Sequence, residues 1–197
     1  MDERERTVPT TRDTEENDRS LRTYVSDMLA LERHIREPLA RQSNDSDVQR
    51  IGEAKTIVDE MFALCERHAA ELESSLSAMG GHAASPVKSA WSQILGAGAA
   101  AIDSIRKTKV SKDLRDDYTA LSLAAVSYSM LHTSGLALGN SAIAELGKLL
   151  FSDYASILVR LGRIIPRVVV EELRLDGESV EPGVVETATQ TVEAVWR

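Results

Sequence analysis

Apolar residues recur at alternating intervals of three and four positions in four long stretches of the chain, which is the spacing of one buried face of a helix. We call each such row of residues a seam. The first stretch follows Ser20, a suitable N-cap residue, and Pro38 within it is expected to kink or shorten the helix. The first seam consists of Leu21, Val25, Met28, Glu32, Ile35 and Leu39. The second seam consists of Ile51, Ala54, Val58, Met61, Cys65, His68, Leu72 and Leu76. It ends near Gly80 and Gly81, which favour the end of a helix.

The third and fourth stretches show the same spacing. The third helix is expected to begin near Asp113 and to end at Gly139 and Asn140, and Ser141 is expected to cap the fourth. The third seam consists of Leu114, Tyr118, Leu121, Ala125, Tyr128 and His132. The fourth seam consists of Ile143, Leu146, Leu150, Asp153, Ile157, Leu161 and Ile164. Beyond Pro166, residues 168–172 either extend this helix or form a short strand.

The order of the four seams predicts an all-α fold, a four-helix bundle. A shorter helix is expected over 87–106, between the second and third members, so their connection is the long one. This resembles the ferritin-like class, which has one such crossover. We divide the chain into a disordered charged tail over 1–19, a bundle over 20–173, and a C-terminal loop and short amphipathic helix over 174–197. Eleven of the first nineteen residues are charged, which is the basis for the predicted tail.

Composition narrows the classes of protein to consider. Aromatic residues make up 4% of the 197 residues, which favours helices built from Ala and Leu over sheets. The net charge of −8 without a basic cluster argues against nucleic-acid binding. Cys65 is the single cysteine, which excludes a disulfide scaffold and a cysteine-based zinc site. No secretory signal precedes the seams, so we expect a cytoplasmic protein.

One uncharged stretch could suggest a membrane, because no Asp, Glu, Lys or Arg occurs between Asp117 and Glu145. It contains seven Ser or Thr residues, so we interpret it as a helix buried in protein and expect no membrane partner. A single bundle buries only one stripe of each helix. The uncharged opposite face therefore predicts a homodimer, with this helix or the 87–106 segment near the interface. The C-terminal helix could dock a further protein partner.

Ionisable residues occupy positions in the seams where apolar residues are expected. Three seams contain such a residue, namely Glu32, His68 and Asp153. Glu71 lies one turn after His68. A buried carboxylate or imidazole costs several kcal/mol, by an estimate of about 2–5, unless it is paired or bound to a metal ion. Oxygen and imidazole ligands suit iron, manganese or zinc. The alternative is a simple hydrogen bond between Glu and His, with no metal.

The order of features resembles the YciF-like bacterial stress proteins, a ferritin-like family. The stretches that carry the resemblance are 24–34 (YVSDMLALERH), 68–71 (HAAE), 86–102 (PVKSAWSQILGAGAAAI), 121–139 (LSLAAVSYSMLHTSGLALG) and 146–153 (LGKLLFSD). The resemblance implies metal-binding carboxylates on the third and fourth helices. The chain departs from it, since Leu121, Ser122 and Ala124 stand where a Glu-His-x-Glu-like string is expected. The fourth helix has Ser152 and Asp153 in place of a pair of Glu.

These departures predict a degenerate metal site formed by Glu32, His68, Glu71 and Asp153. Iron, manganese or zinc at low occupancy is expected there, and an empty site is equally compatible with the residues. We therefore expect a ferritin-like stress or accessory protein that acts by binding or protection. One alternative is a non-haem di-metal oxidase or peroxide-consuming enzyme. The other is a metal-free helical scaffold for protein–protein interaction.

Overall fold

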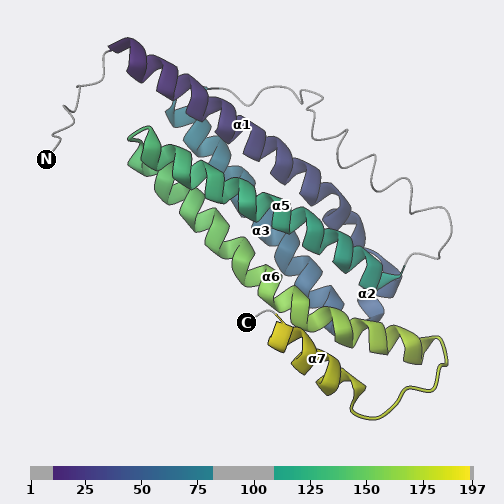
Figure 1. Cartoon of the computed structure of the whole chain (residues 1–197). Coiled ribbons are helices and arrows are strands. Elements are labelled where there is room, and N and C mark those ends of the chain that lie inside the picture. Colours follow the sequence, from purple (N-terminus) through teal and green to yellow (C-terminus); the bar gives the residue numbers. More distant parts are fainter. Residues whose placement is uncertain (1–10, 82–108, 196–197) are drawn as a thin grey trace, which may run out of the picture.

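The computed structural model describes residues 11–81 and 109–195, and their side chains from Glu15 onward. The elements in chain order are α1 (Thr11–Gln42), α2 (Ser46–Arg50), α3 (Gly52–Ala78), α5 (Val110–Ala137), α6 (Ser141–Leu175) and α7 (Val184–Val195) (Figure 1). No strand occurs within these residues, which confirms the all-α prediction. The helix expected over 87–106 lies outside the described residues. None of the described helices is long and apolar enough to cross a membrane.

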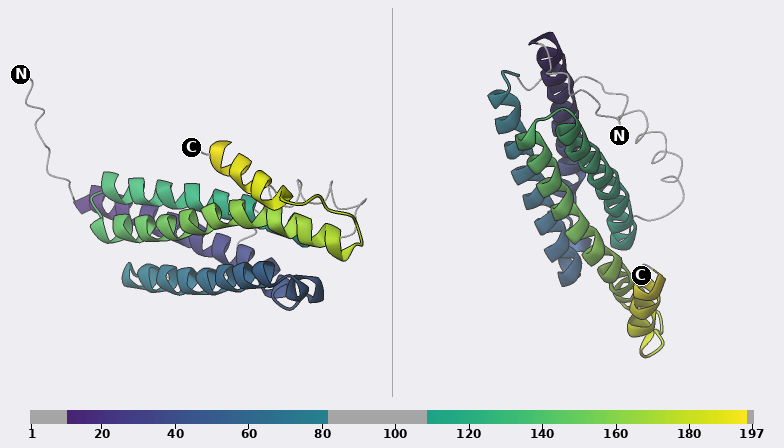
Figure 2. Two further views of the ribbon diagram at one scale, coloured as in Figure 1. Left: turned by 90° about the horizontal axis from the view of Figure 1, so that it is seen from below. Right: turned by 60° about the vertical axis from the view of Figure 1, so that its left-hand side comes forward.

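Four long helices pack side by side, each against two others. α1 contacts α3 and α5, and α6 contacts α3 and α5 (Figures 1 and 2). Contacts between α1 and α3 join Arg22 to Met79 and Arg36 to Glu66, so these two helices are antiparallel. α5 and α6 are joined by a short turn and are antiparallel as well.

The end of α3 and the start of α5 lie at opposite ends of the molecule. Arg22 near the beginning of α1 donates a hydrogen bond to the carbonyl of Met79, 3.0 Å away, just after α3. Gln42 at the end of α1 donates to Asp117 in the second turn of α5, also over 3.0 Å. Residues 22 to 42 of a helix span about 30 Å. Because both α3 and α5 run antiparallel to α1, they are parallel to each other.

Several helix boundaries differ from the sequence-based expectations. α1 begins at Thr11, so the predicted disordered tail was wrong for residues 11–19. Glu15 and Glu16 lie in its first two turns, where the helix dipole favours negative charge. Pro38 does not end α1, which continues to Gln42. The second predicted helix corresponds to α3, which begins at Gly52, and the short helix α2 that precedes Ile51 was not predicted.

The expectations for α6 were partly right. Asn140, and not Ser141, is the N-cap residue, because its side chain accepts a hydrogen bond from the Ile143 amide at 3.1 Å. α6 continues through Pro166 to Leu175, so residues 168–172 extend the helix and do not form a strand. α7 confirms the predicted last helix, although none of its described side chains is buried.

Two glycines allow α5 and α6 to approach closely. A Cβ atom added at Gly147 would lie 2.5 Å from the backbone nitrogen of His132 and 3.0 Å from the carbonyl oxygen of Tyr128. A Cβ atom added at Gly135 would clash with the backbone of Ala144. Only glycine fits at these two contacts, which bring Tyr128 and the neighbouring residues of α6 to the centre of the molecule.

Candidate functional site

The carboxylate of Glu32 lies at the centre of the four long helices with no exposed surface. The hydroxyl of Tyr128, on α5, donates a hydrogen bond to its Oε1 atom. The hydroxyl of Tyr154, on α6, donates to Oε2 over 2.6 Å. The Nδ1 atom of His68, on α3, lies 3.3 Å from Oε1. Each of α1, α3, α5 and α6 therefore contributes one side chain to this cluster, which we call the Glu32 centre.

His68 connects the Glu32 centre to a carboxylate nearer the surface. Its Nε2 atom lies 3.2 Å from Oδ2 of Asp153, a side chain that is 27% exposed. Arg67 donates to the same oxygen over 2.6 Å. The imidazole thus lies between a fully buried carboxylate and one that reaches solvent and is paired with a guanidinium group.

Cys65 contacts the centre from α3. Its Sγ atom lies 3.2 Å from the hydroxyl of Tyr154. Burial, and then the charge of Glu32, raise the pKa of the Cys65 thiol. The same two causes raise the pKa of the Tyr128 and Tyr154 hydroxyls. All three groups keep their protons at neutral pH, so the tyrosines act as donors. Cys65 is a buried core residue with a protonated thiol.

Aromatic rings fill the space around Glu32. The rings of His68 and Tyr154 meet edge to face, with centroids 4.8 Å apart. The rings of Tyr128 and Tyr154 are tilted by 32° with centroids 5.8 Å apart. The centre is packed by rings on several sides.

The four predicted metal ligands come together only in part. Glu32, His68 and Asp153 form one hydrogen-bonded row. Glu71 instead faces Arg67, with its Oε1 atom 3.8 Å from the guanidinium Nε, and its Oε2 atom is buried without a hydrogen-bond partner. Within residues 11–81 and 109–195, no group of three or more His, Cys, Asp and Glu side chains is arranged so that it could hold a metal ion.

The donor atoms present do not fit a resident metal ion. Both oxygens of Glu32 already accept hydrogen bonds from tyrosine hydroxyls. A metal-bound histidine gives one ring nitrogen to the ion and the other to a carboxylate or carbonyl, whereas both nitrogens of His68 lie against carboxylates. The guanidinium of Arg67 already donates to Oδ2 of Asp153, the oxygen that faces His68.

The two tyrosines of the Glu32 centre were not predicted from the sequence as site residues. Tyr128 was placed in the third seam without a polar role, and Tyr154 was passed over for its neighbour Asp153. The structure has Tyr154 fully buried and Asp153 at the edge of the core. Residue 154 lies four positions after Leu150 and three before Ile157, so the helical spacing was compatible with it. A buried Glu whose partners are unassigned is itself a signal to look for hydroxyl donors.

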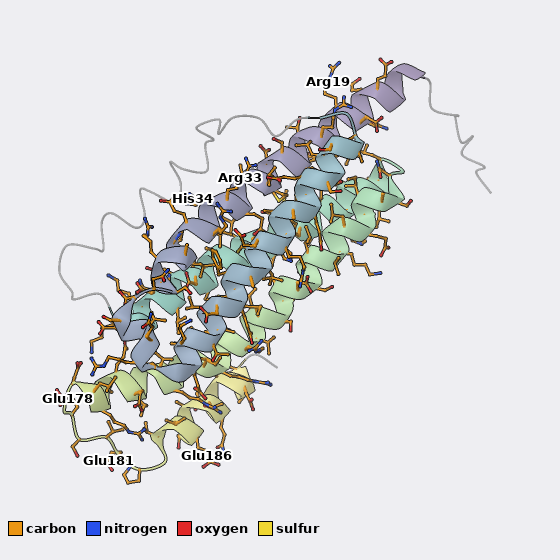
Figure 3. The ribbon with its side chains drawn as sticks, turned by 180° about the vertical axis from the view of Figure 1, so that it is seen from behind. Arg19, Arg33, His34, Glu178, Glu181 and Glu186 are labelled. Carbon is orange, nitrogen blue, oxygen red and sulfur yellow. The ribbon has the colours of Figure 1, made fainter. Side chains whose placement is uncertain are left out.

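The other ionisable residues near Glu32 lie outside the centre. Arg33 and His34, which follow Glu32 on α1, are turned to the surface (Figure 3). Arg33 pairs with Glu73 of α3 over 2.6 Å. His132, at the end of the third seam, lies with its Nδ1 atom 2.7 Å from the carbonyl of Ala144 in the first turn of α6.

A second buried carboxylate lies near the start of α5. Asp117 is 5% exposed, and its Oδ1 atom accepts a hydrogen bond from the amide of Gln42. Its Oδ2 atom and the Oε1 atom of Gln42 are both buried without a partner. Burial raises the pKa of Asp117 to about 7. A proton on the carboxyl removes the charge that burial disfavours.

Comparisons with known proteins add information on the fold alone. No family model matches the chain, and no curated protein sequence matches it. A crystal structure of a protein from Xanthomonas campestris pv. campestris is similar, with a TM-score of 0.65 and 13% sequence identity. The match covers 82% of this chain and 99% of that protein. At this identity, the similarity shows that the arrangement of helices also occurs in a protein from this bacterium.

Proposed function

We propose that the chain is a ferritin-like helical protein that acts by binding and does not carry out redox chemistry on a metal. The observation behind this proposal is the Glu32 centre, where hydrogen bonds from the protein occupy both carboxylate oxygens. A di-metal oxidase needs inward carboxylates and histidines from all four helices. The Glu32 centre places a tyrosine on α5 where such an enzyme would carry a ligand.

The arrangement of helices supports the ferritin-like part of the proposal. Ferritin-like bundles have one long crossover, which connects two parallel helices. α3 and α5 are the parallel pair, and residues 79–109 connect them. The resemblance of the sequence to the YciF-like stress proteins agrees with this connectivity. A role in binding or protection during stress follows from that resemblance and is part of the proposal.

The chemistry of the centre favours a structural role. A buried carboxylate without partners is strongly destabilising, and the two hydroxyls and the imidazole remove that cost. Because each partner comes from a different helix, the network specifies how the four helices align. We therefore propose that the Glu32 centre holds the bundle in one packing and leaves binding to the outer surface.

Iron loading tests the proposal. The purified full chain is incubated aerobically with ferrous iron, and bound iron and oxygen consumption are both measured. We expect iron well below one equivalent per chain and no rapid oxygen consumption. Two irons per chain, as in di-iron proteins, together with rapid oxygen or peroxide turnover, would overturn the proposal in favour of the enzyme.

A pair of variants sharpens this test. Tyr128→Phe combined with Tyr154→Phe removes both hydroxyl donors and frees the oxygens of Glu32. If hydrogen bonds keep metal out, this variant binds more iron than the wild type. Tyr24→Phe, an exposed tyrosine on α1, is the matched control and should bind iron as the wild type does.

A further inference from the structure

A second seam runs along the outward face of α5. It consists of Thr119, Ser122, Val126, Ser129, Thr133 and Leu136, spaced by alternating intervals of three and four. Val126 is 59% exposed and Leu136 is 61% exposed. Met130 lies beside the seam and is equally exposed. No residue of this outer seam carries a charge, which is unusual for a helix face that meets water.

Three of the four hydroxyl groups of the outer seam donate hydrogen bonds to their own helix. Thr119 donates to the carbonyl of Arg115, Ser122 to that of Tyr118 and Thr133 to that of Ser129, over distances of 3.1, 2.7 and 2.9 Å. These bonds to the preceding turn of the same helix satisfy the donors without solvent. The seam can therefore be covered by protein without leaving these three donors unpaired.

The C-terminal helix does not cover this seam. α7 lies on the outer side of α6, away from α3 (Figure 2, left). The groove beside it, of about 330 Å³, is lined by Tyr118, Leu158, Val159 and Val192. α7 thus occupies the end of the face near the start of α5, and the described chain leaves Val126 to Leu136 open.

We propose that a second copy of this chain covers the outer seam, with the two α5 helices antiparallel about a two-fold axis near the middle of the seam. In this register Val126 meets Ser129 of the partner subunit, and Leu136 meets Thr119 of the partner subunit. Each large side chain then faces a small one, which is the self-complementarity that a two-fold interface requires. Because the face is uncharged, bringing it against itself creates no repulsion between like charges.

The area of the face sets how much of it must take part. A seam of 18 residues is about 27 Å long, and a helix is about 10 Å wide, so α5 alone would bury roughly 540 Å² in total. This area is below the roughly 1,000 Å² expected of a biological interface. The adjoining face of α6 must therefore be buried as well for the interface to reach that size. Phe151 of α6 is 40% exposed and lies one turn after Gly147, the glycine in contact with α5. We therefore include Phe151 in the interface. The proposed dimer does not depend on whether the Glu32 centre binds a metal ion.

Light scattering over a range of concentrations tests this inference on the full chain. We expect the mass of a dimer at tens of micromolar. Val126→Glu places a charge at the centre of the interface and should raise the dissociation constant at least about a hundredfold. Tyr24→Glu changes an exposed apolar residue on α1 in the same way and should leave the dimer intact. Thermal unfolding checks that both variants are folded.

Two results would overturn the inference. A strict monomer at high micromolar concentration would mean that another part of the same chain, or a different protein, covers the seam. A dimer that Val126→Glu does not weaken would place the interface elsewhere. Labelling the thiol of a Val126→Cys variant distinguishes cover by the same chain from cover by a second copy. Cover by the same chain protects the thiol from labelling at every protein concentration. Protection that grows with protein concentration supports the proposed dimer.

Discussion

The Nδ1 atom of His68 lies 3.3 Å from Oε1 of Glu32, and neither side chain has any exposed surface. This contact joins α1 to α3 within the Glu32 centre, where the hydroxyls of Tyr128 and Tyr154 also donate to Glu32. The Nε2 atom of His68 faces Asp153, so both residues belong to one polar network that links the four long helices. Substitutions at either position are therefore expected to lower the stability of the whole bundle.

Replacing Glu32 by Ala tests whether the Glu32 centre stabilises the fold. The change leaves His68 and two buried tyrosine hydroxyls without their acceptor, which should lower the free energy of unfolding by about 2–4 kcal/mol. Chemical denaturation with a common slope measures it. Glu37→Ala, five residues along α1 and exposed, should change stability by no more than about 0.5 kcal/mol. Equal free energies of unfolding for the two variants would show that the buried network does not stabilise the fold.

Tyr154→Phe removes a single hydroxyl and keeps the ring packing. Oε2 of Glu32 would then lack the donor it has at 2.6 Å, and Cys65 would lose its contact at 3.2 Å. We expect a loss of about 1–3 kcal/mol, the cost of one unsatisfied buried acceptor. The exposed Tyr24→Phe is the control, and a comparable loss in both would indicate that the hydroxyl itself is unimportant.

The sequence predicted the helices better than their contacts. Alternating spacing in the seams gave the long helices, because burial of one face repeats along the chain. It placed Glu32 and His68 in the core correctly, since both have apolar neighbours one turn away on each side. It could not separate Asp153 from Tyr154, because either position completes the three-and-four spacing between Leu150 and Ile157. The start of α1 at Thr11 was not predicted, because the charged segment before Ser20 has no row of apolar residues. Charged residues nevertheless allow a helix to continue, since they can pair along its surface.

The Asp117 carboxylate predicts a pH dependence of stability. Its pKa is about 7 in the folded chain and about 3.9 in an unfolded one. The folded state therefore binds more protons at this carboxyl between the two values, so the contribution of Asp117 to stability is greatest below about pH 4 and is lost as the pH rises through 7. The loss could reach about 4 kcal/mol, since one pKa unit corresponds to about 1.4 kcal/mol.

Asp117→Asn isolates this contribution. The amide keeps the shape of the side chain but cannot ionise, so the variant should be more stable than the wild type at pH 8 and should lose most of that advantage near pH 4. Asp113, whose pKa burial raises to about 6, contributes in the same direction in both proteins. Asp47→Asn, at an exposed aspartate of α2, is the control. If the difference in stability between Asp117→Asn and the wild type were the same at pH 4 and pH 8, Asp117 would not be protonated in the folded chain.

The contact between α5 and α6 at Gly147 predicts opposite effects of the same substitution at two positions on one helix. In Gly147→Ala, the new methyl group would lie 2.5 Å from the backbone nitrogen and 2.9 Å from the Cα atom of His132. Backbone atoms in a helix cannot move aside, so the two helices must separate. We expect a loss of about 1–3 kcal/mol or more, typical of overpacking.

Gly162→Ala is the matched control, since it lies within α6 and a Cβ atom there meets nothing within 4 Å. Alanine favours a helix over glycine by about 0.5–1 kcal/mol, so this variant should be more stable than the wild type. The separation of α5 from α6 in Gly147→Ala should also weaken the bond from Tyr128 to Glu32, because Tyr128 is one of the residues that the methyl group meets. The cost of Tyr128→Phe should therefore be smaller in the Gly147→Ala background than in the wild type. Additive losses in the double variant would show that the close approach of the helices and the Glu32 centre are energetically independent.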